Sequence, residues 1–182
     1  MAKIILNLVS SQEVYNNEIS IRLFGKITSK KMKTQFNILR KERELVLKFI
    51  DGLTLEQLHT IPEGFSNNIA WNVAHLVVTQ QLLIYRMSGK DCLVSDELIE
   101  AYKKGTKPTT QFTQEEFDEV LELFAGLPDT LEEDYNAEIF TEYKEYPTST
   151  GFVIDSIETA IAFNNFHESL HLGIIMSLKK LV

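Results

Sequence analysis

Apolar side chains recur at helical spacing along four long stretches of this 182-residue chain, and that spacing sets its fold class. Amphipathic helices bury such stripes against one another, so the pattern predicts an all-α four-helix bundle. The first predicted helix covers residues 33–50, and Arg43 is among its charged residues expected to face mostly outward. The second covers residues 66–88, and a short helix is expected near Asp96–Lys104. The third starts at Thr113 and is expected to be broken or kinked at Gly126 and Pro128, and the last covers residues 154–182.

Capping residues mark the ends of these helices. Ser66 or Asn67 can cap the second helix, which is expected to end before Gly89. Thr113 and Glu116 have the spacing of a capping box at the start of the third helix.

Residues 1–31 differ from the helical part of the chain. Ile19, Ile21 and Leu23 alternate with other residues in a weak strand pattern, and polar residues surround them. The length of the chain suits a single domain. We therefore expect residues 1–31 to form an N-terminal extension, outside a bundle domain that covers residues 32–182.

Charge and hydropathy argue against two classes of partner. The formal net charge is -8, whereas general nucleic-acid binding needs a basic face, so no nucleic-acid partner is expected. No segment reaches the ~18 apolar residues of a membrane span, and the apolar run Ile4–Val9 is shorter than a secretory signal core. Cys92 is the only cysteine and cannot form an internal disulfide, which is typical of a reducing compartment. We expect a cytoplasmic protein with no membrane contact.

Three of the four histidines lie on inward-facing stripes of the two most apolar predicted helices. His75 shares its helix face with Trp71 and Val78, and His167 and His171 are four residues apart. Residues with that separation have Cβ atoms about 5–6 Å apart, so the pair can bind one metal ion. The alternatives are that His75 is hydrogen-bonded to a core neighbour, as lone inward histidines usually are, and that the pair flanks a polar pocket.

Antiparallel packing of the two helices would bring His75 close to His167 and His171. An unpartnered imidazole in a core costs about 1–3 kcal/mol, which a shared metal or a shared water network removes. Three histidine ligands also leave positions open for water or substrate, as in catalytic metal sites. Asn72 and Asn164 lie at helical spacing from these histidines, where they either orient the imidazoles or are ordinary polar residues.

The histidine pair also matches the H-E-x-x-H pattern of zinc proteases, with Glu168 in the place of the general base. Such proteases take a third ligand downstream, yet the eleven residues after His171 contain no His, Asp or Glu. A zinc hydrolase is therefore the less favoured alternative, and Glu168 is either a catalytic base or a surface carboxylate. Cys92 has no activating neighbour in the sequence, and His59 lies in a connector where we expect it to be exposed.

Three segments of the chain together resemble the DinB/YfiT-like family of four-helix metal-dependent enzymes. They are FIDGLTLEQLHTIPEG, NNIAWNVAHLVVTQQLLIYRMSG and AFNNFHESLHLGIIMSLKKL. The likeness covers roughly residues 32–182, and the order and spacing of the segments make it specific. The chain departs from the family at one position, because Ile174 follows Gly173 where the family often has glutamine.

The resemblance implies a bundle in up-down-down-up order, with His75, His167 and His171 as the ligands of a divalent ion, usually zinc or nickel. It also implies a transferase or isomerase that acts on a small-molecule substrate and uses a small cellular thiol such as bacillithiol, mycothiol or glutathione. Homodimers are common in the family, so a homodimer is a further expectation. The alternative is a non-enzymatic bundle protein in which the same pocket holds a ligand or a structural metal.

Overall fold

The computed structural model of the protein describes residues 30–182. One compact unit spans Phe36–Val182, whereas residues 30–35, which are helical, belong to a separate unit. The strand pattern expected at Ile19, Ile21 and Leu23 lies outside the described residues. The domain boundary expected after residue 31 stays a prediction.

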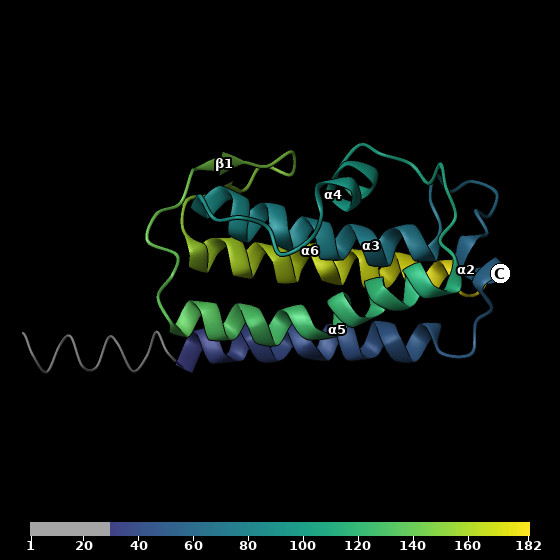
Figure 1. The fold of residues 1–182 in the computed structure, drawn as a ribbon, viewed down its shortest axis with the longest axis horizontal. Coiled ribbons are helices and arrows are strands. Elements are labelled where there is room, and N and C mark those ends of the chain that lie inside the picture. Colours follow the sequence, from purple (N-terminus) through teal and green to yellow (C-terminus); the bar gives the residue numbers. More distant parts are fainter. Residues whose placement is uncertain (1–29) are drawn as a thin grey trace, which may run out of the picture. The chain divides into compact units, whose positions relative to one another are not determined.

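The protein is mostly helical, as the apolar spacing predicts (Figure 1). Within residues 30–182, the strands form a single antiparallel pair of two residues each. The elements are a helix over residues 30–50, α2 Leu55–His59, α3 Ile69–Gln80, the π-helix η1 Gln81–Tyr85, the 3-10 helix η2 Arg86–Ser88, α4 Asp96–Tyr102, α5 Gln114–Asn136, β1 Tyr146–Pro147, β2 Val153–Ile154 and α6 Ile157–Leu178.

The helix that starts with α3 changes its winding before it ends. Asn68 caps it by accepting a hydrogen bond from the Trp71 backbone N–H at 2.8 Å, so the prediction of Ser66 or Asn67 as the cap is wrong. After α3 the chain widens into η1, tightens into η2 and stops at Gly89, whose φ of 67° is left-handed. The predicted end is confirmed, whereas the π turn has no signal in the apolar spacing.

Capping boxes start both α5 and α6. The Thr113 side chain accepts from the Glu116 N–H at 3.2 Å, and the Glu116 carboxylate accepts from the Thr113 N–H at 2.7 Å. This box confirms the predicted start of the third long helix. Ser156 forms the corresponding box at the start of α6, slightly after the predicted residue 154.

Helix α5 contains Pro128 and continues past it, so of the two predicted outcomes at Gly126 and Pro128, a break or a kink, the break is wrong. Proline lacks the N–H that would bond the carbonyl four residues earlier, which here is that of Phe124. The Arg43 Nη1 donates to this carbonyl at 2.8 Å and replaces the missing bond. Arg43 is only 2% exposed, so the expectation that it faces outward is wrong as well.

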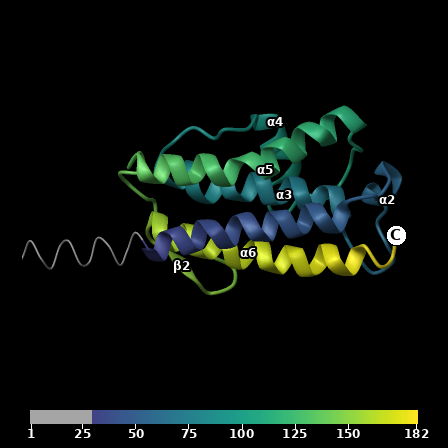
Figure 2. The same ribbon diagram turned by 90° about the horizontal axis from the view of Figure 1, so that it is seen from below.

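Helix α3 is central to the compact unit and packs against α2, α4, α5 and α6. Every residue of α3 except Thr79 is buried, as the apolar residues on more than one of its faces predict. Figures 1 and 2 show residues 36–50, α3, α5 and α6 lying lengthwise beside one another. The colours show that α3 and α5 run in one direction, and that residues 36–50 and α6 run in the opposite direction.

The short elements gather beside two of the long helices. In Figure 1, α4 and the β1–β2 hairpin lie on the same side of α3 and α6. None of the helices in the described part of the chain is long and apolar enough to cross a membrane.

Candidate metal centre

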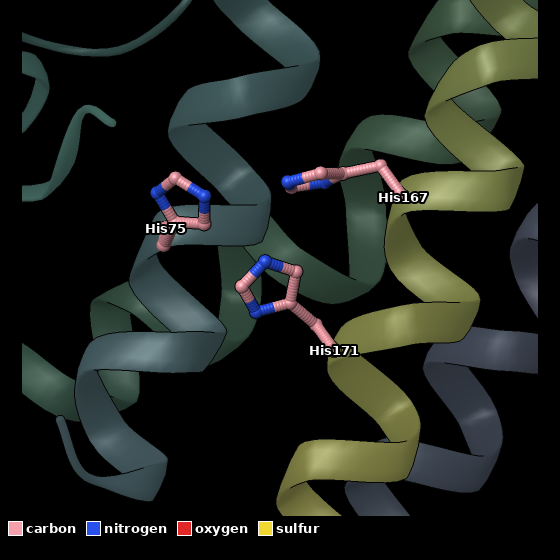
Figure 3. Close-up of side chains that lie close together, drawn as sticks. All are labelled: His75, His167 and His171. Atoms are coloured by element: carbon pink, nitrogen blue, oxygen red, sulfur yellow. The ribbon is translucent and has the colours of Figure 1, made fainter. Parts of the chain in front are cut away.

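The structure brings together the three histidines that the sequence singles out (Figure 3). His75 comes from α3, and His167 and His171 come from successive turns of α6. One nitrogen from each of the three rings lies within 4.8 Å of the other two. The ring centroids are 5.3 Å apart for His75–His167, 4.9 Å for His75–His171 and 4.5 Å for His167–His171.

Helix packing and one aromatic contact hold His75 in this position. The α3 and α6 helices run antiparallel and in contact, so the middle of α3 faces the middle of α6. The indole of Trp71, one turn before His75, stacks on the imidazole with a centroid separation of 4.6 Å and an angle of 10°. The His75 ring is therefore held flat against Trp71, with one edge open to the other two histidines.

Hydrogen bonds set the tautomers of two of the imidazoles. The Nδ1 of His75 lies 2.7 Å from the carbonyl oxygen of Tyr102, which can only accept, so this nitrogen carries the proton. The Nδ1 of His171 lies 2.7 Å from the Oδ1 of Asn72, whose amide nitrogen in turn donates to the Asn68 carbonyl at 2.6 Å. Both rings consequently carry their lone pair on Nε2, the nitrogen that a metal ion would bind.

Asn72 thus has the orienting role that its spacing suggested. Asn164 does not have that contact, because its side-chain nitrogen donates to the Glu168 carboxylate at 2.9 Å. Thr79 adds a contact that the sequence did not suggest, since its hydroxyl lies 3.3 Å from the Nε2 of His75.

The third imidazole, that of His167, is incompletely satisfied. Its Nδ1 is buried and has no hydrogen-bond partner among the described residues. A buried nitrogen without a partner costs about 1–3 kcal/mol, and an ion or water shared by the cluster would remove that cost. The donor set fits a divalent transition metal, because neutral imidazoles are ligands that zinc, nickel and copper accept.

The three histidines also have the protonation state that metal binding requires. Burial lowers the pKa of His75. Burial, and then the charges of His75 and Lys104, lower the pKa of His167 to about 4. Burial, and then the charges of His167 and His75, lower the pKa of His171 to about 3. All three rings are therefore neutral at physiological pH, with lone pairs available to a metal.

A cavity of about 490 Å³ adjoins the histidines. Its volume lies within the range of about 300–1,000 Å³ that is typical of small-molecule sites. Its walls come from α3, η1, η2, α6, the segment after α4 and the β1–β2 hairpin. Besides the histidines, the lining residues are Asn67, Trp71, Thr79, Leu82, Leu83, Arg86, Met87, Lys104, Gly105, Tyr146, Thr148, Ser149, Thr150 and Phe163.

Glu168, the candidate general base, is not part of the three-residue cluster of possible ligands in residues 30–182. Its side chain is 1% exposed, so the alternative of a surface carboxylate is wrong. The carboxylate accepts hydrogen bonds from Arg43 at 2.7 and 3.1 Å and from Asn164 at 2.9 Å. Glu168 therefore belongs to a buried ion pair in the core.

His59 and Cys92 have ordinary structural roles. The expectation that His59 is exposed is wrong: it is 8% exposed, with Nδ1 2.8 Å from the Leu55 carbonyl and Nε2 accepting from the Phe112 N–H at 3.0 Å. Cys92 is half-buried, and burial raises the pKa of its thiol. A thiol with a raised pKa is a weak nucleophile near neutral pH, which agrees with the lack of an activating neighbour in the sequence.

Sequence reasoning missed Arg43, although the sequence contains a signal for its burial. Arg43 lies four residues after Leu39 and three before Val46, so it falls on the buried stripe of the first helix. It also missed Tyr102 and Lys104, because their position near the histidines depends on the path of a connector.

Comparison with known protein families gives one match. The model of the DinB superfamily matches residues 38–175, which include all three histidines. A search of curated proteins found no match.

Proposed function

The chain belongs to the DinB superfamily, and from this premise we propose that His75, His167 and His171 bind one divalent metal ion in a four-helix-bundle enzyme. The observation that carries the proposal is the meeting of three neutral imidazoles in the wall of a cavity. Zinc and nickel are the ions that the family resemblance favours. Imidazole nitrogen suits both of them.

The proposed fold is the bundle in up-down-down-up order. The directions of the long helices support it, since α3 and α5 are parallel to each other and antiparallel to residues 36–50 and α6. In this order the histidine-bearing helices α3 and α6 are antiparallel neighbours, which lets a single residue of α3 meet two residues of α6.

The proposed reaction is the transfer of a small cellular thiol to an electrophile, or an isomerisation that uses such a thiol. A divalent ion in the site would supply Lewis acidity that favours the thiolate form of the thiol. The protein's own residues have two tasks in this scheme. Tyr102 and Asn72 hold the protons of His75 and His171 on Nδ1, and the apolar cavity walls shield the reactants from water. The raised pKa of Cys92 supports a thiol that comes from a cosubstrate and not from the chain.

A non-enzymatic binding protein is the second candidate function, because the same cavity would hold a ligand without any reaction. The zinc hydrolase has less support than either. Its general base would be Glu168, whose carboxylate is already hydrogen-bonded to Arg43 and Asn164. A cytoplasmic location, a homodimer and the absence of a nucleic-acid partner also remain proposals.

Metal analysis tests the core of the proposal. We expect about one divalent ion per chain in the purified or zinc-titrated protein, and its loss in His171→Ala. A matched control is His59→Gln, which alters a histidine that lies outside the cluster. Absence of metal uptake by the wild-type protein, or unchanged occupancy in His171→Ala, would refute the proposed site.

Activity assays then choose between the candidate functions. A metal-loaded protein that conjugates small thiols to a panel of electrophiles supports the transferase. Peptide cleavage without conjugation supports the hydrolase, and ligand binding without turnover supports the binding protein.

A further inference from the structure

The cavity beside the histidines has a charge opposite to that of the chain. The formal net charge of the protein is -8, yet the described residues that line the cavity include Arg86 and Lys104 and no Asp or Glu. Arg86 is compensated by Asp96, which lies 3.2 Å away and outside the lining. No carboxylate of residues 30–182 is within ion-pair distance of Lys104. Lys104 is therefore the uncompensated positive charge of the cavity.

Two anchors place Lys104 over the cavity. The carbonyl of Tyr102 accepts from His75, and the hydroxyl of Thr106 accepts from the Trp71 Nε1 at 3.2 Å. Both ends of the five-residue stretch 102–106 are thus tied to α3, and Lys104 stands in the middle of it. Its position follows from residues that also shape the histidine cluster.

The amino group of Lys104 reaches across to the β1–β2 hairpin. Its Nζ donates to the Ser149 hydroxyl at 2.8 Å, which leaves two of its three N–H donors for a ligand. Thr148 and Thr150 also line the cavity, but their hydroxyls lie 2.9 Å from each other and bond within the hairpin. The free N–H donors of the ammonium group can therefore bind an anion such as a carboxylate.

Most of the remaining wall of the cavity is apolar. Trp71 and Phe163 contribute aromatic faces, and Leu82 and Leu83 project from the π-helix η1. Single π turns within longer helices occur frequently at functional sites, and here the π turn supplies two lining residues. A ligand would consequently meet apolar side chains as well as the histidines and Lys104.

We infer that the cavity selects a small molecule with an apolar body and an anionic group, a carboxylate or a phosphate, and that Lys104 binds the anionic group. This inference rests on the proposed function, because it takes the cavity as the substrate site. It goes beyond that function by naming the chemical class of the substrate and the residue that selects it.

The chain contains one tryptophan, Trp71, and it lines the cavity, so its fluorescence reports on occupancy. The test titrates the full-length protein with 4-phenylbutyrate and with its neutral analogue 4-phenylbutyramide, in the absence and presence of zinc. We expect the carboxylate to bind about tenfold more tightly than the amide without zinc, a factor that corresponds to about 1.4 kcal/mol.

Matched variants identify the residue responsible. Lys104→Glu should abolish the preference for the carboxylate and Lys104→Arg should keep it. Lys107→Glu makes the same charge change at an exposed lysine outside the lining and should keep the preference. Binding of neither compound, equal binding of both, survival of the preference in Lys104→Glu or its loss in Lys107→Glu would each overturn the inference.

The two proposals fail in distinguishable ways. A carboxylate preference in a protein that takes up no metal would preserve the role of Lys104 and refute the metal site. Stoichiometric zinc binding that His171→Ala abolishes, without any carboxylate preference, would do the opposite.

Discussion

Replacement of Arg43 by methionine should be among the most destabilising single changes in the core. The side chain is 2% exposed and donates to the Glu168 carboxylate at 2.7 and 3.1 Å, to the Gln80 Oε1 at 2.8 Å and to the Phe124 carbonyl at 2.8 Å. Methionine fills much of the space but leaves a buried carboxylate without its countercharge. Removal of one partner of a buried pair costs about 3–5 kcal/mol, against a total stability of about 5–15 kcal/mol for a typical domain.

Urea unfolding followed by circular dichroism measures this loss. Arg40→Met is the matched control, because Arg40 lies one turn earlier and pairs with Asp129 and Glu132 while 30% exposed. A more exposed pair contributes about 1 kcal/mol or less, so the control should remain close to the wild type. A loss below about 1 kcal/mol in Arg43→Met would refute the assigned role of the pair.

The double variant Arg43→Met/Glu168→Gln separates the charge from the packing. The amide carries no charge, so the double variant should be more stable than Arg43→Met alone. Its Oε1 can also keep the hydrogen bond from Asn164. If the two changes instead add their separate costs, the buried charge is not the source of the loss.

Three further predictions concern the site and the proline. Asn72→Ala should lower metal affinity about 10–100-fold, since His171 loses its orienting acceptor; competition with a chelator measures this, and unchanged affinity would contradict it. The metal-free protein should lose stability as pH falls from 6.5 to about 4. Over this range the histidines of the unfolded chain bind protons, whereas His167 and His171 of the folded chain do not, because their pKa values are lowered. A free energy of unfolding in urea that does not change over this pH range would count against this. Pro128→Ala should change the free energy of unfolding by less than ~1 kcal/mol, not the ~3 kcal/mol usual for a helix interior, because Arg43 already satisfies the carbonyl that the proline leaves free; a gain near the larger value would refute this.

The histidine cluster was accessible to sequence reasoning because each of its parts has a local signal. The spacing of His167 and His171 places them on one helix face, and the apolar neighbours of His75 turn it inward. Antiparallel packing of two apolar helices is enough to bring the three together. Asn72 lies one turn from His75 on α3, so the same antiparallel packing brings it to His171.

The errors at Pro128 and His59 share one physical cause, which is that a distant residue satisfied a local defect. Pro128 should disrupt a helix considered alone, because it leaves the carbonyl of Phe124 without its usual N–H donor. The guanidinium of Arg43, which lies 81 residues before Phe124 in the sequence, donates to that carbonyl instead. His59 is polar and lies in a connector, yet a backbone N–H from residue 112 makes its burial acceptable. Local patterns contain no information about such partners, so Lys104 was likewise beyond prediction.

The H-E-x-x-H segment shows how one helix serves two structures at once. Residues four apart share a face, so His167 and His171 both turn toward α3, whereas Glu168 is rotated about 100° and meets Arg43. Arg43 also contacts Gln80 of α3 and Phe124 of α5, so this one side chain of the first helix contacts all three of the other long helices. A hydrogen-bonded contact of this kind is directional, unlike apolar packing, and it favours one rotation of α6 about its axis. That rotation is the one that presents both histidines to His75, which explains how a glutamate inside a protease-like motif can position a histidine cluster while its own carboxylate is bonded to Arg43.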